Sequence, residues 1–162
     1  MATTSDRIEK RITLKAPLSR VWSAISDSQQ FGQWFGVRFD GPFVAGKAMV
    51  GFITPTTVDA EIAKSQQPYT GKPFNVTIEA ITAPTRFAFR WHPFAVDEKH
   101  DYSKEPTTLV EFVLQETKDG TQLTITESGF DQVPLERRAE AFKANDGGWA
   151  AQTQLIAKYL AQ

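Results

Sequence analysis

Apolar and polar residues alternate along several stretches of the chain, and this alternation predicts β-strands. Between residues 7 and 15, Ile8, Ile12 and Leu14 alternate with charged and polar residues, and Pro17 ends the stretch. Similar apolar rows, each bounded by turn-forming residues, occur at 74–82, 86–94, 107–117 and 121–130. A period of two is that of a strand with one buried face, so the sequence predicts an antiparallel sheet.

Helical spacing appears at both ends of the chain. Val21, Trp22 and Ile25 follow an entry signal at Pro17, which predicts a short helix, and a second short helix ends at Gly36. Residues spaced three and four apart from position 134 onward predict a long helix that reaches the C-terminus. Proline at the first turn supports the start of that helix.

The stretches between these elements complete the expected order. Residues 37–53 form two apolar runs joined through glycines and a proline, which predicts a hairpin with an irregular turn. Residues 54–73 carry three prolines and little periodicity, which is typical of a functional flap or a flexible excursion. Strand, two short helices, about six antiparallel strands and a long final helix together indicate an α+β fold. We expect a single domain over residues 1–162.

The apolar stripe of the last helix is interrupted near its middle. Asp146 and Thr153 lie in an otherwise apolar row, and Gly147 and Gly148 stand beside them. A glycine in a helix interior costs about 1 kcal/mol relative to alanine. Either the glycines end one helix and Asn145 or Asp146 caps another, or the missing side chains leave room for a cavity beneath the helix. The two interpretations are compatible.

Glu127 breaks the apolar row that Leu123 and Ile125 begin. A buried, unpaired carboxylate is costly, so Glu127 must be paired, protonated, exposed at the strand end or wetted by a pocket. We favour exposure at the strand end, with a pocket-lining role as the main alternative. If Glu127 and Asp146 face each other across the domain, a proton shared between them could support acid–base catalysis.

Composition and charge exclude several classes of function. The formal net charge of −1 lacks the basic excess of a nucleic-acid-binding domain. No signal peptide or apolar run of membrane-spanning length is visible, and there is no cysteine, which fits a cytoplasmic protein. His92 and His100 are the only histidines, and no nucleotide or acyl-transfer motif occurs, so we expect neither a metal nor a cofactor. Twelve phenylalanines and four tryptophans either pack a heavy core or line an apolar cavity.

Several segments together resemble the activator-of-heat-shock-protein-90-ATPase-homologue-like family, which belongs to the START-like (SRPBCC, Bet v 1-like) helix-grip superfamily. The resemblance runs from about residue 8 to 160, and it rests on "APLSRVWSAISDSQQFGQWF", "RFAFRW", "TTLVEFVL", "DGTQLTITESGF" and "GGWAAQTQLIAKYL". It implies a curved antiparallel sheet of about six to seven strands wrapped around the C-terminal helix. Two short helices after the first strand would close one end, and an apolar cavity would lie between sheet and helix.

The resemblance also implies pocket positions at Trp34, Trp91, Phe112, Glu127 and Trp149. With the aromatic and polar positions noted above, the candidate ligand-binding residues are Trp34, Phe39, Phe89, Trp91, Phe112, Glu127, Phe142, Asp146, Trp149 and Thr153.

We expect a small hydrophobic or aromatic ligand in a cavity of roughly 300–1,000 Å³. One alternative is a polyketide cyclase- or aromatase-like enzyme that uses the pocket carboxylates. Another is a chaperone-activator-like interaction module of the stress response, with a chaperone or a second copy of the chain as partner. We expect no nucleic-acid partner and no insertion into a membrane.

Overall fold

The fold was analysed in a computed structural model, which describes residues 7–95, 97 and 99–162. Strands and helices follow one another in an order that confirms the α+β fold. In chain order they are β1 (Arg7–Leu14), α1 (Leu18–Ser26), α2 (Ser28–Phe35), β2 (Val37–Phe39), β3 (Ala48–Ile53), α3 (Ala60–Gln66), the 3-10 helix η1 (Gln67–Tyr69), β4 (Pro73–Thr82), β5 (Arg86–Trp91), β6 (Thr108–Thr117), β7 (Gly120–Ser128), the 3-10 helix η2 (Phe130–Gln132) and α4 (Leu135–Ala161).

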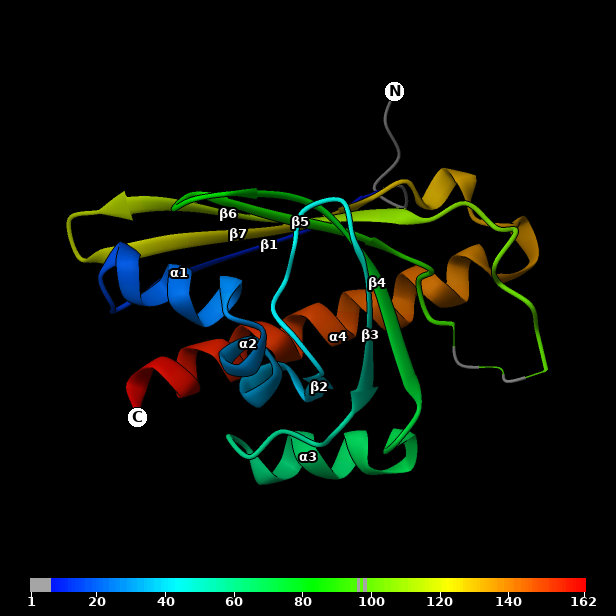
Figure 1. Ribbon diagram of the computed structural model, residues 1–162, viewed down its shortest axis with the longest axis horizontal. Helices are drawn as coiled ribbons and strands as arrows, with labels where there is room; N and C mark the ends of the chain where they lie inside the picture. The colour runs from blue at the N-terminus through cyan, green and yellow to red at the C-terminus, as the bar shows by residue number, and fades with distance from the viewer. Residues whose placement is uncertain (1–6, 96, 98) are drawn as a thin grey trace.

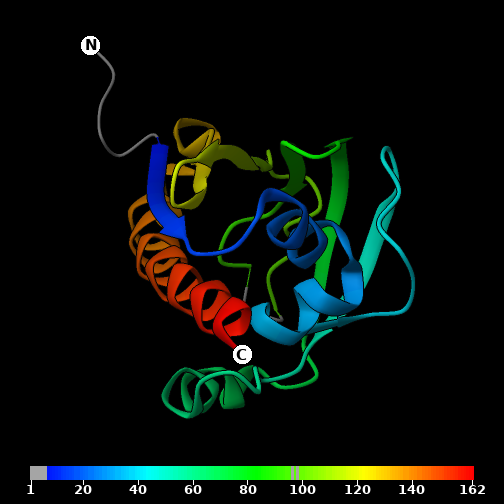
Figure 2. The ribbon, with the colours of Figure 1, turned by 90° about the vertical axis from the view of Figure 1, so that its left-hand side faces the viewer.

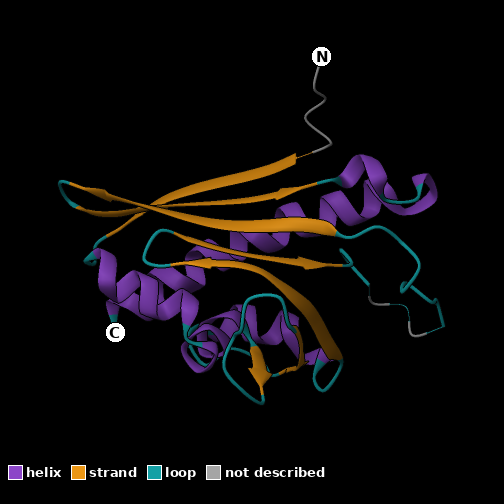
Figure 3. Ribbon diagram, turned by 45° about the horizontal axis from the view of Figure 1, so that its top comes forward, coloured by secondary structure: helices purple, strands orange, loops and turns teal. Residues whose placement is uncertain are grey.

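The seven strands form one antiparallel sheet in the order β1-β7-β6-β5-β4-β3-β2. The sheet is strongly curved: β3 and β4 bend away from the layer of β1, β6 and β7 and descend past α4 (Figure 1). The long helix runs along the sheet on its inner side, and α1 and α2 lie near its C-terminal half (Figures 2 and 3). This arrangement is the expected helix grip.

The turn between α2 and β2 places the first aromatic side chains inside the grip. Gly36 ends α2 in the left-handed conformation, with φ 98°, as expected for a glycine after the last helical residue. On the inner side of β3, a Cβ atom at Gly51 would lie 2.9 Å from the ring of Phe39. The absence of a side chain at Gly51 therefore lets the Phe39 ring lie directly on β3.

Helix α4 passes through both glycines without a break, which contradicts the expectation that they end one helix and begin another. Gly147 and Gly148 are exposed, and a Cβ atom at either position would meet nothing within 4 Å. They therefore leave no space over the interior. The inner face of α4, which includes the buried Trp149 and Ile156, packs on the sheet. Such packing holds a helix together despite the low helix propensity of two residues on its outer face.

Residues 54–73 are structured and contain α3 and η1. Gln66 fixes the segment to the domain, because its Oε1 accepts from the Thr56 N–H at 2.8 Å and its Nε2 donates to the Phe35 carbonyl at 3.1 Å. Lys158 of α4 forms an ion pair with Asp59. Movement of this segment as a flap stays a prediction.

Candidate ligand-binding interior

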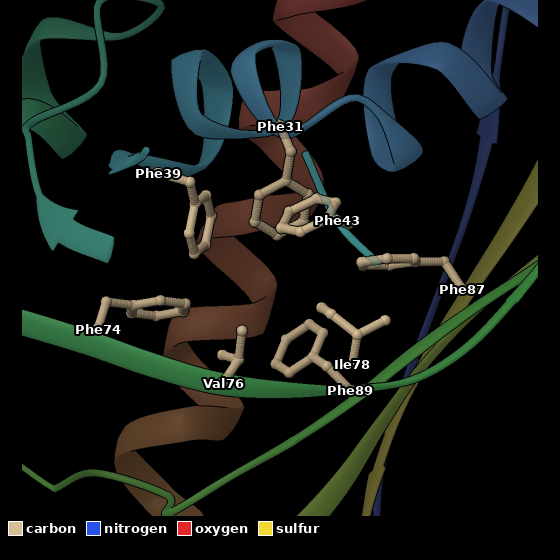
Figure 4. Close-up of a pocket in the computed structure, with 8 residues that line it drawn as sticks. All are labelled: Phe31, Phe39, Phe43, Phe74, Val76, Ile78, Phe87 and Phe89. Atoms are coloured by element: carbon tan, nitrogen blue, oxygen red, sulfur yellow. The ribbon is translucent and has the colours of Figure 1, made fainter. Parts of the chain in front are cut away.

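The space between the sheet and helix α2 is lined only by apolar side chains. The narrow gaps between these side chains add up to about 160 Å³, and no part of them is wide enough for a water molecule. The rings point toward one another from α2, β2, the loop after β2, β4 and β5 (Figure 4). The lining consists of Phe31, Phe39, Phe43, Phe74, Val76, Ile78, Phe87 and Phe89, and we call this region the phenylalanine void.

Ring packing explains why the void is smaller than the cavity of 300–1,000 Å³ that we expected. Phe31 projects from α2 (Figure 4) and is stacked on Phe35 with a centroid distance of 4.7 Å. The Phe43 ring stands edge-on to Phe31 at 5.6 Å, and Phe87 lies 6.3 Å away. These are the separations of aromatic pairs in contact. The phenylalanines therefore occupy the space that a ligand would need, and binding requires some of the rings to move apart.

An open groove lies on the outer side of the same wall. Its volume is about 940 Å³, and its lining combines the turn between α1 and α2, β2, Gly41–Pro42 and residues 54–57. Phe39 lines both this groove and the phenylalanine void. The ring of Phe39 therefore separates the void from the surface.

Glu127 lies at the centre of a polar cluster next to the void. Its Oε2 accepts hydrogen bonds from Trp91 Nε1 at 2.7 Å and from Thr108 Oγ1 at 2.5 Å. Its Oε1 accepts from Trp149 Nε1 at 2.8 Å, and Asn145 Nδ2 lies 3.0 Å from Oε1 and 3.1 Å from Oε2. Strand β5, strand β6 and α4 thus converge on one carboxylate, and we call these five residues the Glu127 cluster.

The position of Glu127 contradicts our preference for exposure at the strand end. The residue is the last but one of β7, but β1 and β6 flank it and α4 covers it, so none of it is exposed. Within the part of the chain that the structure describes, none of the ion pairs includes Glu127. The carboxylate is therefore paired, which was one of the alternatives that we considered. Its partners are neutral donors and not a cation.

Asp146 does not face Glu127. Its carboxylate forms an ion pair with Lys10 of β1 at 2.9 Å, and its side chain is 48% exposed. Asn145, one residue earlier on α4, takes the place that we expected for Asp146. The prediction of two facing carboxylates, on which the acid–base hypothesis depended, is therefore wrong.

The remaining candidates serve the packing of the interior. Trp34 is fully buried, and its Nε1 donates to the Ala24 carbonyl at 2.9 Å, which ties α2 to α1. The hydroxyl of Thr153 donates at 2.7 Å to the Ala150 carbonyl of its own helix. Two further rings pack edge-on against buried neighbours, Phe112 against Trp149 at 5.8 Å and Phe142 against Phe130 at 5.1 Å.

The ten candidates thus fall into three groups. Phe39 and Phe89 line the phenylalanine void, whereas Trp91, Glu127 and Trp149 belong to the Glu127 cluster. The other five lie outside both regions.

Sequence reasoning missed six of the eight residues that line the void and two of the five residues of the Glu127 cluster, although most of them follow the periodicity of their strand or helix. Phe74, Val76 and Ile78 of β4 form such a row, and all three line the void. Thr108 precedes the buried Val110 by two residues and therefore points to the same face of β6. Asn145 lies one helical turn before Trp149, on the same face of α4.

Two aromatic contacts connect the regions. Trp91 of the Glu127 cluster lies 5.3 Å from Phe74 and 5.4 Å from Phe89, both of which line the void. Trp91 and Phe74 are each partly exposed. An apolar body in the void would therefore be separated from the carboxylate of Glu127 by a single layer of rings.

Beyond this cluster, an ion-pair clasp fixes the loop between β5 and β6 to the first turn of α4. Arg137 donates to Glu105 Oε1 and to the Pro93 carbonyl, both at 2.8 Å, and His100 Nε2 lies 2.6 Å from Glu105 Oε2. Burial raises the pKa of Glu105, but the hydrogen bonds from His100 and Arg137 together outweigh burial and lower it below 4.5.

Neither a metal-binding group nor a membrane-spanning helix occurs among the described residues. No group of three or more histidine, aspartate or glutamate side chains there has the geometry to hold a metal ion. No described helix combines the length and the apolar character needed to cross a membrane.

Solved structures similar to this chain share its fold at low sequence identity. A protein from Arthrobacter aurescens has a TM-score of 0.73 at 17% identity, and the match covers 99% of this chain and 89% of that one. Protein MLL2253 from Mesorhizobium loti has a TM-score of 0.69 at 16% identity, with 96% of each chain covered. DynU16, a putative protein in the dynemicin biosynthetic locus, has a TM-score of 0.67 at 22% identity. That match covers 97% of this chain but only 48% of DynU16, so the chain spans about half of its length.

Comparison with curated proteins finds no match. Residues 15–161, which include α1, α2, the strands of the void and all of the Glu127 cluster, match the family described as activator of Hsp90 ATPase homolog 1-like protein. The chain therefore belongs to this family.

Proposed function

We propose that this domain binds a small apolar or aromatic molecule between the curved sheet and helices α2 and α4. The observation that carries the proposal is the phenylalanine void, where eight apolar side chains surround a space with no polar group. Ligand pockets are mostly apolar with a few placed polar groups at one side. The Glu127 cluster supplies such groups beyond Trp91 and Phe74.

Two of the rings that close the void toward the surface belong to segments at the edge of the sheet. Phe39 belongs to β2, an edge strand of three residues, and Phe43 lies in the loop that follows it. Segments with few neighbours open at a lower free-energy cost than the central strands. Movement of Phe39 and Phe43 would join the void to the groove of about 940 Å³ outside.

The two alternatives have less support. A cyclase with two facing carboxylates lacks its second acid, because Asp146 is paired with Lys10 at 2.9 Å. The family name connects the chain with an activator of a chaperone ATPase, but no surface feature of the described residues favours a chaperone or a second copy of the chain as partner.

Filling the void with a protein side chain tests the proposal. Val76 lines the void and is 4% exposed, so the Val76→Phe ring would occupy the space between the existing rings. The probe is naphthylmethanol, a neutral aromatic alcohol, and its affinity is measured by quenching of tryptophan fluorescence and by calorimetry. We expect the wild type to bind it and Val76→Phe to lose binding.

The matched control places the same ring on the outer face of the sheet. Val113 lies on β6 and is 41% exposed, so Val113→Phe adds equal apolar surface away from the void. It should bind the probe as the wild type does. Overpacking a core costs about 1–3 kcal/mol, so a melting curve must show that Val76→Phe remains folded. Undiminished binding by folded Val76→Phe, or no binding by the wild type, would overturn the proposal.

A further inference from the structure

We infer that the ligand carries a positive charge, as an amine attached to an apolar or aromatic body, and that Glu127 is the group that selects it. The inference rests on the proposed function, because the apolar body is taken to occupy the phenylalanine void. It adds the chemical class of the ligand, which the void alone does not define.

Among the described residues, Glu127 has no positively charged partner. The side chain is fully buried and accepts five hydrogen bonds, all from neutral donors. The two indole N–H groups can only donate, and each oxygen of Glu127 accepts from one of them, so the site suits a group that offers two acceptor oxygens. Buried charges are normally compensated by an opposite charge. No such partner is present among the described ion pairs of the protein.

The side chains around the carboxylate also suit a cation. Trp91 and Trp149 lie 5.8 Å apart, and Phe74 stands edge-on to Trp91 at 5.3 Å. The faces of tryptophan and phenylalanine rings attract ammonium groups. Because Trp91 and Phe74 are partly exposed, an ammonium group could lie against them with the carboxylate directly behind.

Asn145 marks the place where a cation can reach the carboxylate itself. Its amide straddles both oxygens, at 3.0 and 3.1 Å, and these are the longest hydrogen bonds of the cluster. The residue is also half-buried, whereas Thr108 and Trp149 are buried. A ligand ammonium would replace a neutral donor by a charged one, and charge-assisted hydrogen bonds are roughly twice as strong.

The void and the Glu127 cluster lie next to each other in the interior, so one ligand could contact both. Phe74 and Phe89 line the void on one side and contact Trp91 on the other. When a ligand has its apolar body in the void, a substituent that passes between these rings reaches Trp91 and, behind it, the carboxylate of Glu127.

Two probes of nearly equal shape test the inference. Naphthylmethylamine is protonated at neutral pH, like other primary alkyl amines, whereas naphthylmethanol is neutral. We expect the wild type to bind the amine about tenfold more tightly than the alcohol, from coulombic attraction to Glu127. Glu127→Gln should bind both with equal affinity. Glu116→Gln, which removes one charge from an exposed position of β6, should keep the preference of the wild type.

A second variant keeps the test decisive should Glu127→Gln fail to fold. Asn145→Ala removes the neutral donor from the accessible side of the carboxylate, so it should strengthen binding of the amine while leaving that of the alcohol unchanged. A purely structural role of the cluster would weaken both. Equal affinity of the wild type for the two probes, or weaker amine binding by Asn145→Ala, would overturn the inference and leave the proposed function intact. Failure of both probes to bind would overturn both.

Discussion

The phenylalanine void and the Glu127 cluster are neighbouring regions of one interior, yet they are stabilised in opposite ways. The void is bounded by rings and aliphatic side chains that make no hydrogen bond across it. The Glu127 cluster is held by five hydrogen bonds that join β5, β6 and α4 to one carboxylate of β7. Only a layer of rings that includes Phe74 and Phe89 lies between them.

The contrast indicates which part of the interior can change shape. Apolar contacts are non-directional, so rings can separate and close again around another apolar body. Hydrogen bonds to a buried carboxylate have fixed geometry, and an unmade bond there is costly. We therefore expect the side near β2 to open for a ligand, while the side under α4 keeps its shape, apart from the amide of Asn145, and provides specificity.

Removal of the Glu127 carboxylate should have the largest effect on stability. Glu127→Ala leaves the buried indole of Trp149, the partly exposed indole of Trp91, one amide and one hydroxyl without their acceptor. We expect the free energy of unfolding to fall by about 3–5 kcal/mol, as for other broken buried polar networks. Urea denaturation measures this loss, and a loss below about 1 kcal/mol would show that the cluster does not fix α4 to the sheet.

Truncation of Phe39 should affect the apolar region less and in a different manner. Phe39→Ala should lower the free energy of unfolding by about 3 kcal/mol, the low end for phenylalanine truncations, because one side of the ring already faces the groove. It should also accelerate association of naphthylmethanol, because it removes the ring between void and surface. Stopped-flow fluorescence measures the rate, and slower association than in the wild type would exclude this route.

Stiffening α4 on its outer face should stabilise the domain without disturbing the Glu127 cluster. Gly148→Ala adds a methyl group that meets nothing within 4 Å and improves helix propensity. The expected gain is about 0.5–1 kcal/mol in the free energy of unfolding. Thermal denaturation monitored by circular dichroism checks it, and destabilisation would mean that the exposed glycine has a conformational role in this helix.

The smallest expected effect concerns the clasp beyond the cluster. Because the pKa of Glu105 is lowered in the folded protein, its contribution to stability is present above pH 4.5 and is lost as the pH falls through the folded pKa. Glu105→Gln should therefore lose less of its melting temperature between about pH 5 and pH 3 than the wild type. Parallel pH profiles for wild type and variant would contradict this assignment.

Periodicity predicted the fold well because each strand and helix has its own apolar row. The Asp119-Gly120 turn, the rows of β5 to β7 and the start of the long helix were all visible in the sequence. The glycines of α4 misled us, because helix propensity is a local property and the packing of the inner face overrides it.

The site was harder to predict, because its polar partners come from different elements. Glu127 was identified by its place in an apolar row, but periodicity does not reveal that Thr108 and Asn145 complete its hydrogen bonds. A difference of one position on α4 separates Asn145, which reaches the carboxylate, from Asp146, which pairs with Lys10. The sequence does not reveal the size of the void either, because that size depends on how the rings pack.

Contacts between a bound ligand and the rings of the void provide the most direct test of the account. Nuclear Overhauser effects between naphthylmethylamine and ring-labelled protein would locate the naphthyl group. We predict contacts to Phe31, Phe74 and Phe89, and contacts of the aminomethyl protons to Trp91. Contacts confined to the outer groove at Arg38 and Pro42, or none to any ring of the void, would contradict the claim that this interior opens to hold a ligand.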